Sequence, residues 1–149
     1  MIREAIKDLV GGNSLGLTQA SNIMREIMEG GSTPSQLAAF LTALHIKGET
    51  PEEIAGMASV MREKSLKVSI PGLLVDTAGT GGDMKNTINI STGSAIIAAG
   101  AGLKVAKHGN RAATGSCGSA DVLEELGINI ELGPTGVREC IKRTGFGFM

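Results

Sequence analysis

Over the first 66 residues, apolar positions recur every three or four residues, which is the spacing of amphipathic helices. Two helix starts carry explicit capping signals, Thr33 before Pro34 and Thr50 before Pro51, and the second adds a capping-box acid at Glu53. Glycines follow the apolar runs where helices would end. We therefore predict a helical subdomain over residues 1–66, with helices near residues 2–10, 17–29, 34–47 and 51–66.

The pattern changes after Pro71 and Gly72, where short apolar runs begin to alternate with helical stretches. Strands that alternate with helices indicate a parallel sheet covered on both faces, so residues 73–149 are typical of an α/β fold class. The small-residue stretch "STGSAIIAAGAG" is apolar on every side and predicts a buried helix. We expect buried or sheet strands at residues 73–75, 103–108, 128–132 and 147–149, and helices at residues 91–102, 119–127 and 134–144.

Composition excludes several classes of function. The 149 residues carry a net charge of −1, so they lack the basic excess of a nucleic-acid-binding protein. Three Phe, with no Trp or Tyr, argue against base-stacking surfaces. Two cysteines, Cys117 and Cys140, predict neither a zinc site nor a disulfide framework, and together with the lack of a signal-peptide pattern they favour a cytoplasmic location.

The stretch "DTAGTGGDMKNTINIST", residues 76–92, follows the first expected strand and is rich in glycine and hydroxyl residues. Successive glycines let backbone N–H groups approach an anion closely. Neither the dinucleotide motif G-x-G-x-x-G nor a P-loop lysine is present, so the alternative of a simple tight turn stays open. Asn89, Ser91 and Thr92 stand before "GSAIIAAGAG" and predict a second anion site at a helix N-terminus, although plain capping explains them equally well.

A third loop, "KHGNRAATGSCGSAD", follows the expected strand at residues 103–108. Lys107 and Arg111 supply positive charge, and His108 and Asn110 supply directional donors. Lys107 and Arg111 have the alternative role of solvated surface charges, and His108 that of a structural histidine. Because parallel strands present their carboxyl ends at one edge, these loops are expected to meet there, and together they favour a highly phosphorylated small ligand.

The motifs "GTGGD", "NIST" and "KHGNR…GSAD" resemble those of the anthranilate phosphoribosyltransferase family, whose fold is shared with nucleoside phosphorylases of the thymidine phosphorylase type. The resemblance runs along the whole chain. It implies transfer of the phosphoribosyl group from 5-phosphoribosyl 1-diphosphate (PRPP) to anthranilate with Mg²⁺, a step of tryptophan biosynthesis that releases diphosphate. It also implies a homodimer formed through the helical subdomain, where the alternative role for the Met-rich faces is internal core.

The resemblance assigns site residues by position. Asn110 is expected to face anthranilate and the Ser91 hydroxyl to lie in a magnesium shell. Asp83 is expected to orient substrate near the first loop. The full set expected to bind substrate is Gly79, Gly82, Asp83, Thr87, Asn89, Ile90, Ser91, Thr92, Lys107, His108, Gly109, Asn110, Arg111, Ala112, Ala113, Thr114, Gly115 and Ser119.

The chain also departs from the family pattern. Family members are more than twice as long, and an Asp-Glu pair that binds magnesium and an Arg that meets anthranilate belong to their later portion. We therefore expect this chain to be an N-terminal part with little turnover of its own. Cys117 stands where serine-rich variants are usual and is expected to be a small filler. Two alternatives remain: a non-catalytic dimerisation or phosphate-binding fragment, and a pyrimidine nucleoside phosphorylase relative.

Overall fold

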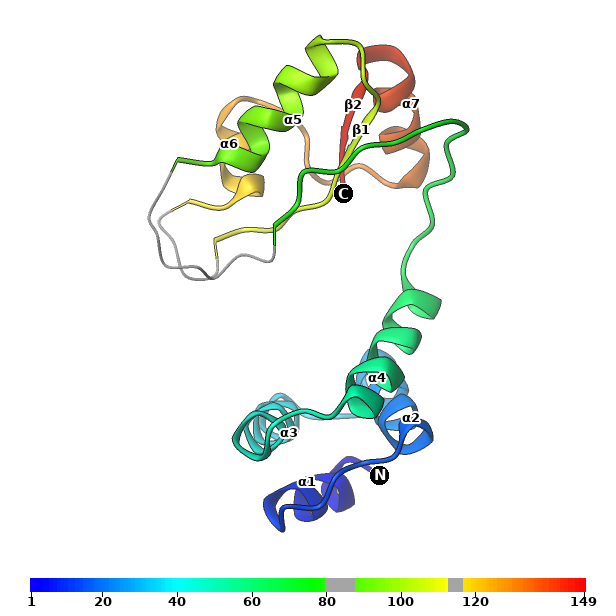
Figure 1. Ribbon diagram of the computed structural model, residues 1–149, viewed down its shortest axis with the longest axis vertical. Coiled ribbons are helices and arrows are strands. Elements are labelled where there is room, and N and C mark those ends of the chain that lie inside the picture. The colour runs from blue at the N-terminus through cyan, green and yellow to red at the C-terminus, as the bar shows by residue number, and fades with distance from the viewer. Residues whose placement is uncertain (80–87, 113–116) are drawn as a thin grey trace. The chain divides into compact units, whose positions relative to one another are not determined.

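The computed structural model describes residues 1–79, 88–112 and 117–149 (Figure 1). The chain divides into two compact units, Met1–Ser65 and Leu66–Met149, and each is described by itself. None of the helices in the described ranges is long and apolar enough to cross a membrane.

The first unit consists of helices whose ends are encoded locally. Thr33 and Thr50 each accept a hydrogen bond from the backbone N–H three residues on, at 3.3 Å in both cases, and each is followed by proline. Gly48 follows one of these helices with a positive φ of 85°, which an L side chain rarely adopts. The four helices expected in this region are confirmed as α1 (Ile2–Val10), α2 (Leu17–Met28), α3 (Pro34–Lys47) and α4 (Pro51–Lys64).

The core of the helical unit is aliphatic apart from one aromatic ring. Met57 is half-buried and packs against the core, whereas Met28 and Met61 are exposed. Helices α2 and α4 approach closely at Gly56, where a Cβ atom would strike the Leu17 carbonyl oxygen and the Ala20 side chain. The buried core residues are Ile2, Ala5, Leu9, Leu15, Ala20, Ile23, Phe40, Ala43 and Leu44.

Glu53 is a fully buried carboxylate at the first turn of α4. Its two oxygens accept hydrogen bonds from the backbone N–H groups of Leu15, at 2.8 Å, and Thr50, at 2.7 Å. The Lys47 ammonium, itself mostly buried, donates a third at 2.9 Å. Burial raises the pKa of Glu53, but these three donors outweigh that effect and hold the pKa below its usual value. The carboxylate thereby ties the segment before α2 to the α3–α4 junction.

The second unit is built on a parallel pair of short strands, β1 (Val105–Lys107) and β2 (Phe146–Phe148), paired in the register Val105↔Phe146. Helix α5 (Ile90–Gly100) precedes β1, and helices α6 (Ser119–Glu125) and α7 (Pro134–Thr144) lie between the strands in sequence. Figure 1 shows α5 and α6 on one side of the strand pair and α7 on the other. This helical bundle followed by the beginning of a parallel sheet confirms the predicted fold class.

Two of the expected strands are wrong. Residues 73–75 are not a buried strand: Leu73 is 81% exposed, and only Val75 forms a single parallel bridge, to Val105. Residues 128–132 form no strand, and the Asn129 side chain accepts the Glu131 N–H at 2.9 Å, a local bond that competes with ladder pairing. The strand expected at 147–149 is found one residue earlier.

Helix α5 also differs from the prediction. It begins at Ile90, so Ser91 and Thr92 lie inside its first turn rather than before it. It is not buried on every side, since Ile97 is 74% exposed and only Thr92 and Ala95 are fully buried. The all-apolar sequence left open which face of the helix is covered. In the described part of this unit, its contacts with β1, β2 and α6 cover one face.

Candidate functional site

Hydrogen bonds join three segments of the second unit at the carboxyl end of β1. The Thr77 hydroxyl donates to the Ser91 carbonyl at 2.6 Å and so links the first loop to the start of α5. The His108 N–H donates to Asp76 Oδ1 at 3.3 Å and links the first loop to the segment after β1. The Asn89 amide donates to the Cys117 carbonyl at 3.3 Å and links the residue before α5 to the residues before α6. These three bonds form a triangle among the first loop, the start of α5 and the loop between β1 and α6. The three regions that sequence motifs singled out are therefore adjacent in space.

The N-terminus of α5 lies at this junction. Asn89 is the residue before the helix, and its Oδ1 accepts a hydrogen bond from the buried Thr92 hydroxyl at 2.7 Å. No side-chain oxygen in the described residues caps the helix. The first N–H groups of a helix lack intrahelical acceptors and carry about half a positive charge, so this end is suited to an anion. Ser91 is half-buried in that first turn.

Lys107, the last residue of β1, is a buried cation with 1% of its surface exposed. Its ammonium donates to the His108 carbonyl at 2.9 Å. Within the described ranges it forms no ion pair. The positive charge is therefore balanced by no described carboxylate, in contrast to Lys47 of the helical unit.

The segment after β1 is held in place mainly by its backbone. The Gly109 N–H donates to the Met149 carbonyl at 3.2 Å, and a Cβ at Gly109 would strike the Ser119 hydroxyl and the Phe148 ring. Ser119 Oγ accepts the Asn110 N–H at 3.2 Å and donates to the Asn110 carbonyl at 3.3 Å. Gly109 and Ser119 thus have a packing role that explains their residue types without any ligand.

Arg111 does not present a free guanidinium. Its two terminal nitrogens form a fork with the Glu124 carboxylate, at 2.8 and 3.1 Å, and one of them also donates to Asp121 at 3.2 Å. The hydrogen bond with Glu124, followed by its charge and the contribution of Asp121, raises the pKa of Arg111. The same guanidinium lowers the pKa of Glu124.

The remaining expected site residues fall into two groups. Gly79, Ile90, His108, Asn110 and Ala112 are described, and all five are exposed. Six lie outside the described residues: Gly82, Asp83, Thr87, Ala113, Thr114 and Gly115.

Sequence reasoning missed the two residues that connect the loops, Asp76 and Thr77. Asp76 accepts the N–H of Ala78 at 3.0 Å as well as that of His108, so one carboxylate shapes two loops. Only their position could have identified them, because an acid and a hydroxyl residue directly follow an apolar run. Sequence reasoning also missed that Asp121 accepts a hydrogen bond from the Arg111 guanidinium.

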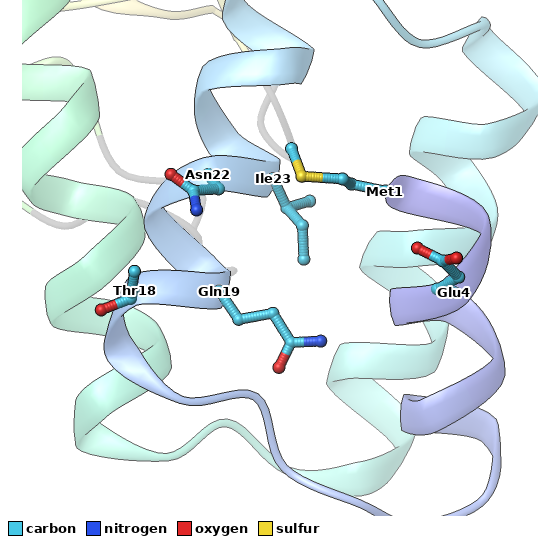
Figure 2. A pocket seen from close by; sticks show the side chains of 6 residues that line it. All are labelled: Met1, Glu4, Thr18, Gln19, Asn22 and Ile23. Carbon is cyan, nitrogen blue, oxygen red and sulfur yellow. The ribbon is translucent and has the colours of Figure 1, made fainter.

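No metal cluster marks the site in the described part of the chain. No group of three or more His, Cys, Asp or Glu side chains there is arranged to hold a metal. A pocket of about 380 Å³ lies in the helical unit between α1 and α2 (Figure 2). Its walls contain one carboxylate and no expected site residue, and they are formed by Met1, Glu4, Thr18, Gln19, Asn22 and Ile23.

Comparison with known proteins agrees with the division of the chain. Residues 72–149 match a family described as "Glycosyl transferase family, a/b domain", and residues 3–65 match "Glycosyl transferase family, helical bundle domain". The chain is 60% identical over 148 residues to an anthranilate phosphoribosyltransferase of Chloroflexus aggregans, and 59% identical over 149 residues to one of Dehalococcoides mccartyi. These matches cover 99% and 100% of this chain but only 44% of each relative.

Two solved structures extend the likeness to three dimensions. The anthranilate phosphoribosyltransferase of Thermus thermophilus is 46% identical, with a TM-score of 0.77, over 97% of this chain and 44% of that one. The enzyme from Saccharomyces cerevisiae in complex with PRPP and Mg is 28% identical, with a TM-score of 0.81, over 99% of this chain and 46% of that one. The resemblance inferred from the loop motifs is confirmed, and the chain spans less than half the length of these relatives.

Proposed function

Because the chain belongs to the glycosyl transferase family defined by this helical bundle and a/b domain, we propose that it is the N-terminal part of an anthranilate phosphoribosyltransferase. The proposed reaction transfers the 5-phosphoribosyl group of PRPP to anthranilate, forming N-(5-phosphoribosyl)anthranilate and diphosphate. The 60% identity to a protein of that name over almost the whole chain supports this proposal. The step belongs to tryptophan biosynthesis and is proposed to take place in the cytoplasm.

The single structural observation that carries the proposal is the triangle of hydrogen bonds among the three loop segments. PRPP carries phosphate groups at two ends, so its cradle requires donors from more than one segment. The uncapped N-terminus of α5 and the buried Lys107 ammonium supply positive potential near the same junction. Gly79, Asn89, Ser91 and Thr92 are proposed to meet diphosphate, and His108, Asn110 and Ser119 to complete the PRPP site.

Displacement of diphosphate from the anomeric carbon passes through an oxocarbenium-like state, as in glycoside cleavage. The departing diphosphate gains negative charge while the amine of anthranilate is already nucleophilic. Fixed dipoles and a buried cation stabilise that charge without reorganising, so the proposed catalytic contribution of this chain is to bind and orient PRPP. Arg111 is proposed to contribute through its backbone, because its guanidinium is already paired.

Magnesium is proposed to accompany PRPP, as in the yeast enzyme, whose structure is a complex with both. The described residues fit an ion that arrives with the substrate: they supply the Ser91 hydroxyl and no carboxylate cluster. Mg²⁺ prefers oxygen ligands and keeps several waters, and diphosphate oxygens meet that preference. When bound, the ion would neutralise charge on the leaving group.

The helical unit is proposed to form a homodimer contact. Its surface retains several exposed large apolar side chains, among them Leu41, Ile54 and Met61. Apolar side chains scattered on a surface are normal, so the oligomeric state needs direct measurement by light scattering.

Calorimetric titration of this chain with PRPP, with and without Mg²⁺, tests the proposed function. We expect saturable, magnesium-dependent binding of PRPP and none of uridine with inorganic phosphate, which a pyrimidine nucleoside phosphorylase relative would bind. Ser91→Ala should weaken the magnesium-dependent binding roughly tenfold, about 1.4 kcal/mol. Ser94→Ala is the matched control, because Ser94 is an exposed residue one turn further along the same helix.

The outcomes separate the candidate functions. No binding of PRPP by the wild-type chain would contradict the proposal that these loops form a cradle. Binding of inorganic phosphate and PRPP with equal affinity would favour a phosphate-binding fragment, the second candidate suggested by the 44% coverage of the relatives.

A further inference from the structure

The carboxylate of Asp121, in the first turn of α6, bonds to the residue that precedes the helix and to two residues of the segment after β1. Oδ2 accepts the N–H of Gly118 at 2.7 Å and the N–H of Ala112 at 3.0 Å. Oδ1 accepts the Arg111 guanidinium at 3.2 Å. An acid at the third helical position commonly accepts the N–H of the capping residue, which accounts for Gly118 alone. Helix capping does not explain the bonds to Ala112 and Arg111.

Local packing leaves this arrangement little freedom. A Cβ atom at Gly118 would strike the backbone of Arg111 and Ala112 and the Asn110 carbonyl oxygen, so residues 110–112 and 118 are in direct contact. The Asn110 carbonyl also accepts the Ala120 N–H at 3.1 Å. The segment after β1 is therefore bonded to the start of α6 through both Asn110 and Ala112. Among the described residues, Asp121 is the only one whose side chain bonds to both Ala112 and Gly118.

Electrostatics favours the ionised form of Asp121. Hydrogen bonds from the N–H of Gly118 and then Ala112, followed by that of Arg111, lower the pKa of the Asp121 carboxyl. Among the described residues, the charged side chains that face it are Arg111 and, on the same helix, Glu124. Arg111 bonds to both carboxylates at once and offsets one of their two negative charges.

We propose that Asp121 is a positioning residue for PRPP binding: it fixes Ala112 and Gly118 at one spacing, and Arg111 serves as its counter-ion rather than as a substrate ligand. This inference rests on the proposed function. The exposed side chains of His108 and Asn110, which are proposed to contact PRPP, lie on the segment that these bonds fix. Groups whose spacing is set in advance bind an anion without the free-energy cost of ordering them on binding.

A spectroscopic measurement on the wild-type chain tests the arrangement itself. The amide proton resonances of Ala112 and Gly118 should both move with pH at one shared midpoint below 3.8, because both N–H groups donate to one carboxylate. Asp121→Asn should abolish the shared midpoint and Glu125→Gln should preserve it. Separate midpoints in the wild-type chain, or a shared one that persists in Asp121→Asn, would overturn the proposal.

Binding of Mg²⁺ with PRPP tests the consequence. Asp121→Asn should weaken binding at least tenfold at unchanged helix content, whereas Glu124→Gln, which removes the fork to Arg111 but no backbone bond, should stay within twofold. Glu125→Gln removes the same charge from an exposed site on α6 and is the matched control. Equal affinity of Asp121→Asn and wild type would overturn the positioning role alone. Failure of the wild-type chain to bind would overturn the proposed function and this role with it.

Discussion

Each unit of the molecule contains one charged residue that is almost completely buried, and the two residues differ in how fully their charges are paired. Glu53 of the helical unit is surrounded by three donors, two backbone N–H groups and an ammonium, so its charge is fully used within the fold. Lys107 of the α/β unit donates to one carbonyl and meets no carboxylate in the described part of the chain. A buried charge with complete partners indicates a structural role, whereas a buried ammonium without a counter-ion among the described residues supports the proposed binding of an anion.

The largest expected effect is the loss of stability on removal of the Glu53 carboxylate. Glu53→Ala leaves two N–H groups and the Lys47 ammonium without their acceptor, and loss of one partner of a buried pair costs about 3–5 kcal/mol. We expect the urea midpoint of the helical unit, followed by far-UV circular dichroism, to fall accordingly. The control is Glu52→Ala at the exposed neighbouring position, where loss of a favourable charge at a helix N-terminus costs under about 1 kcal/mol. Similar losses in both variants would contradict the structural role of Glu53.

Acid provides the same test without mutation. Because the pKa of Glu53 is lower in the folded state than its ordinary 4.5, the unfolded state binds more protons between the two values, and stability rises with pH there. The contribution of Glu53 is therefore complete above pH 4.5 and is lost as the pH falls through the folded pKa. Unfolding free energies of wild type and Glu53→Gln, measured in urea over an acid series, should converge as the pH falls. Parallel curves would show that the carboxylate is not held by these donors.

A pair of helical glycines compares the packing of the two units. Gly56→Ala places a methyl group against the Leu17 carbonyl at the α2–α4 contact and should destabilise by about 1–3 kcal/mol. Gly93→Ala in α5 meets nothing within 4 Å and should stabilise by about 0.5–1 kcal/mol through helix propensity. Thermal unfolding of the two variants measures both changes. A stabilising Gly56→Ala would mean that α2 and α4 do not approach at that glycine.

The same contrast explains what sequence alone predicts. The helical unit is encoded by signals within a few residues of each other, such as Thr33 with Pro34 and Thr50 with Glu53, and its helices are predicted correctly. Strands depend on partners far away in sequence. Leu73 to Val75 have the apolar character of a strand, yet only Val75 pairs. Near residue 129, the Glu131 N–H bonds to the Asn129 side chain instead of to a neighbouring strand.

The candidate site shows the same limit. The rule that loops meet at the carboxyl ends of parallel strands predicts correctly that the described parts of the three loop segments come together. Sequence pattern did not reveal that Arg111 pairs with a carboxylate 13 residues further on. The sequence does not show which side chains of α6 face this loop, so it does not show that the Arg111 guanidinium is paired.

The smallest expected effect on stability belongs to the incompletely paired charge. Lys107→Met removes the ammonium but keeps a side chain of similar length, so the cost of one lost hydrogen bond to the His108 carbonyl, about 1 kcal/mol, is offset by relief of a buried charge. The urea midpoint should therefore move little, while calorimetry should show that Mg²⁺ with PRPP binds at least tenfold more weakly. Lys104→Met, at an exposed residue just before β1, should change neither quantity. A loss of stability as large as that of Glu53→Ala would instead make Lys107 a structural charge, and the contrast between the two units would disappear.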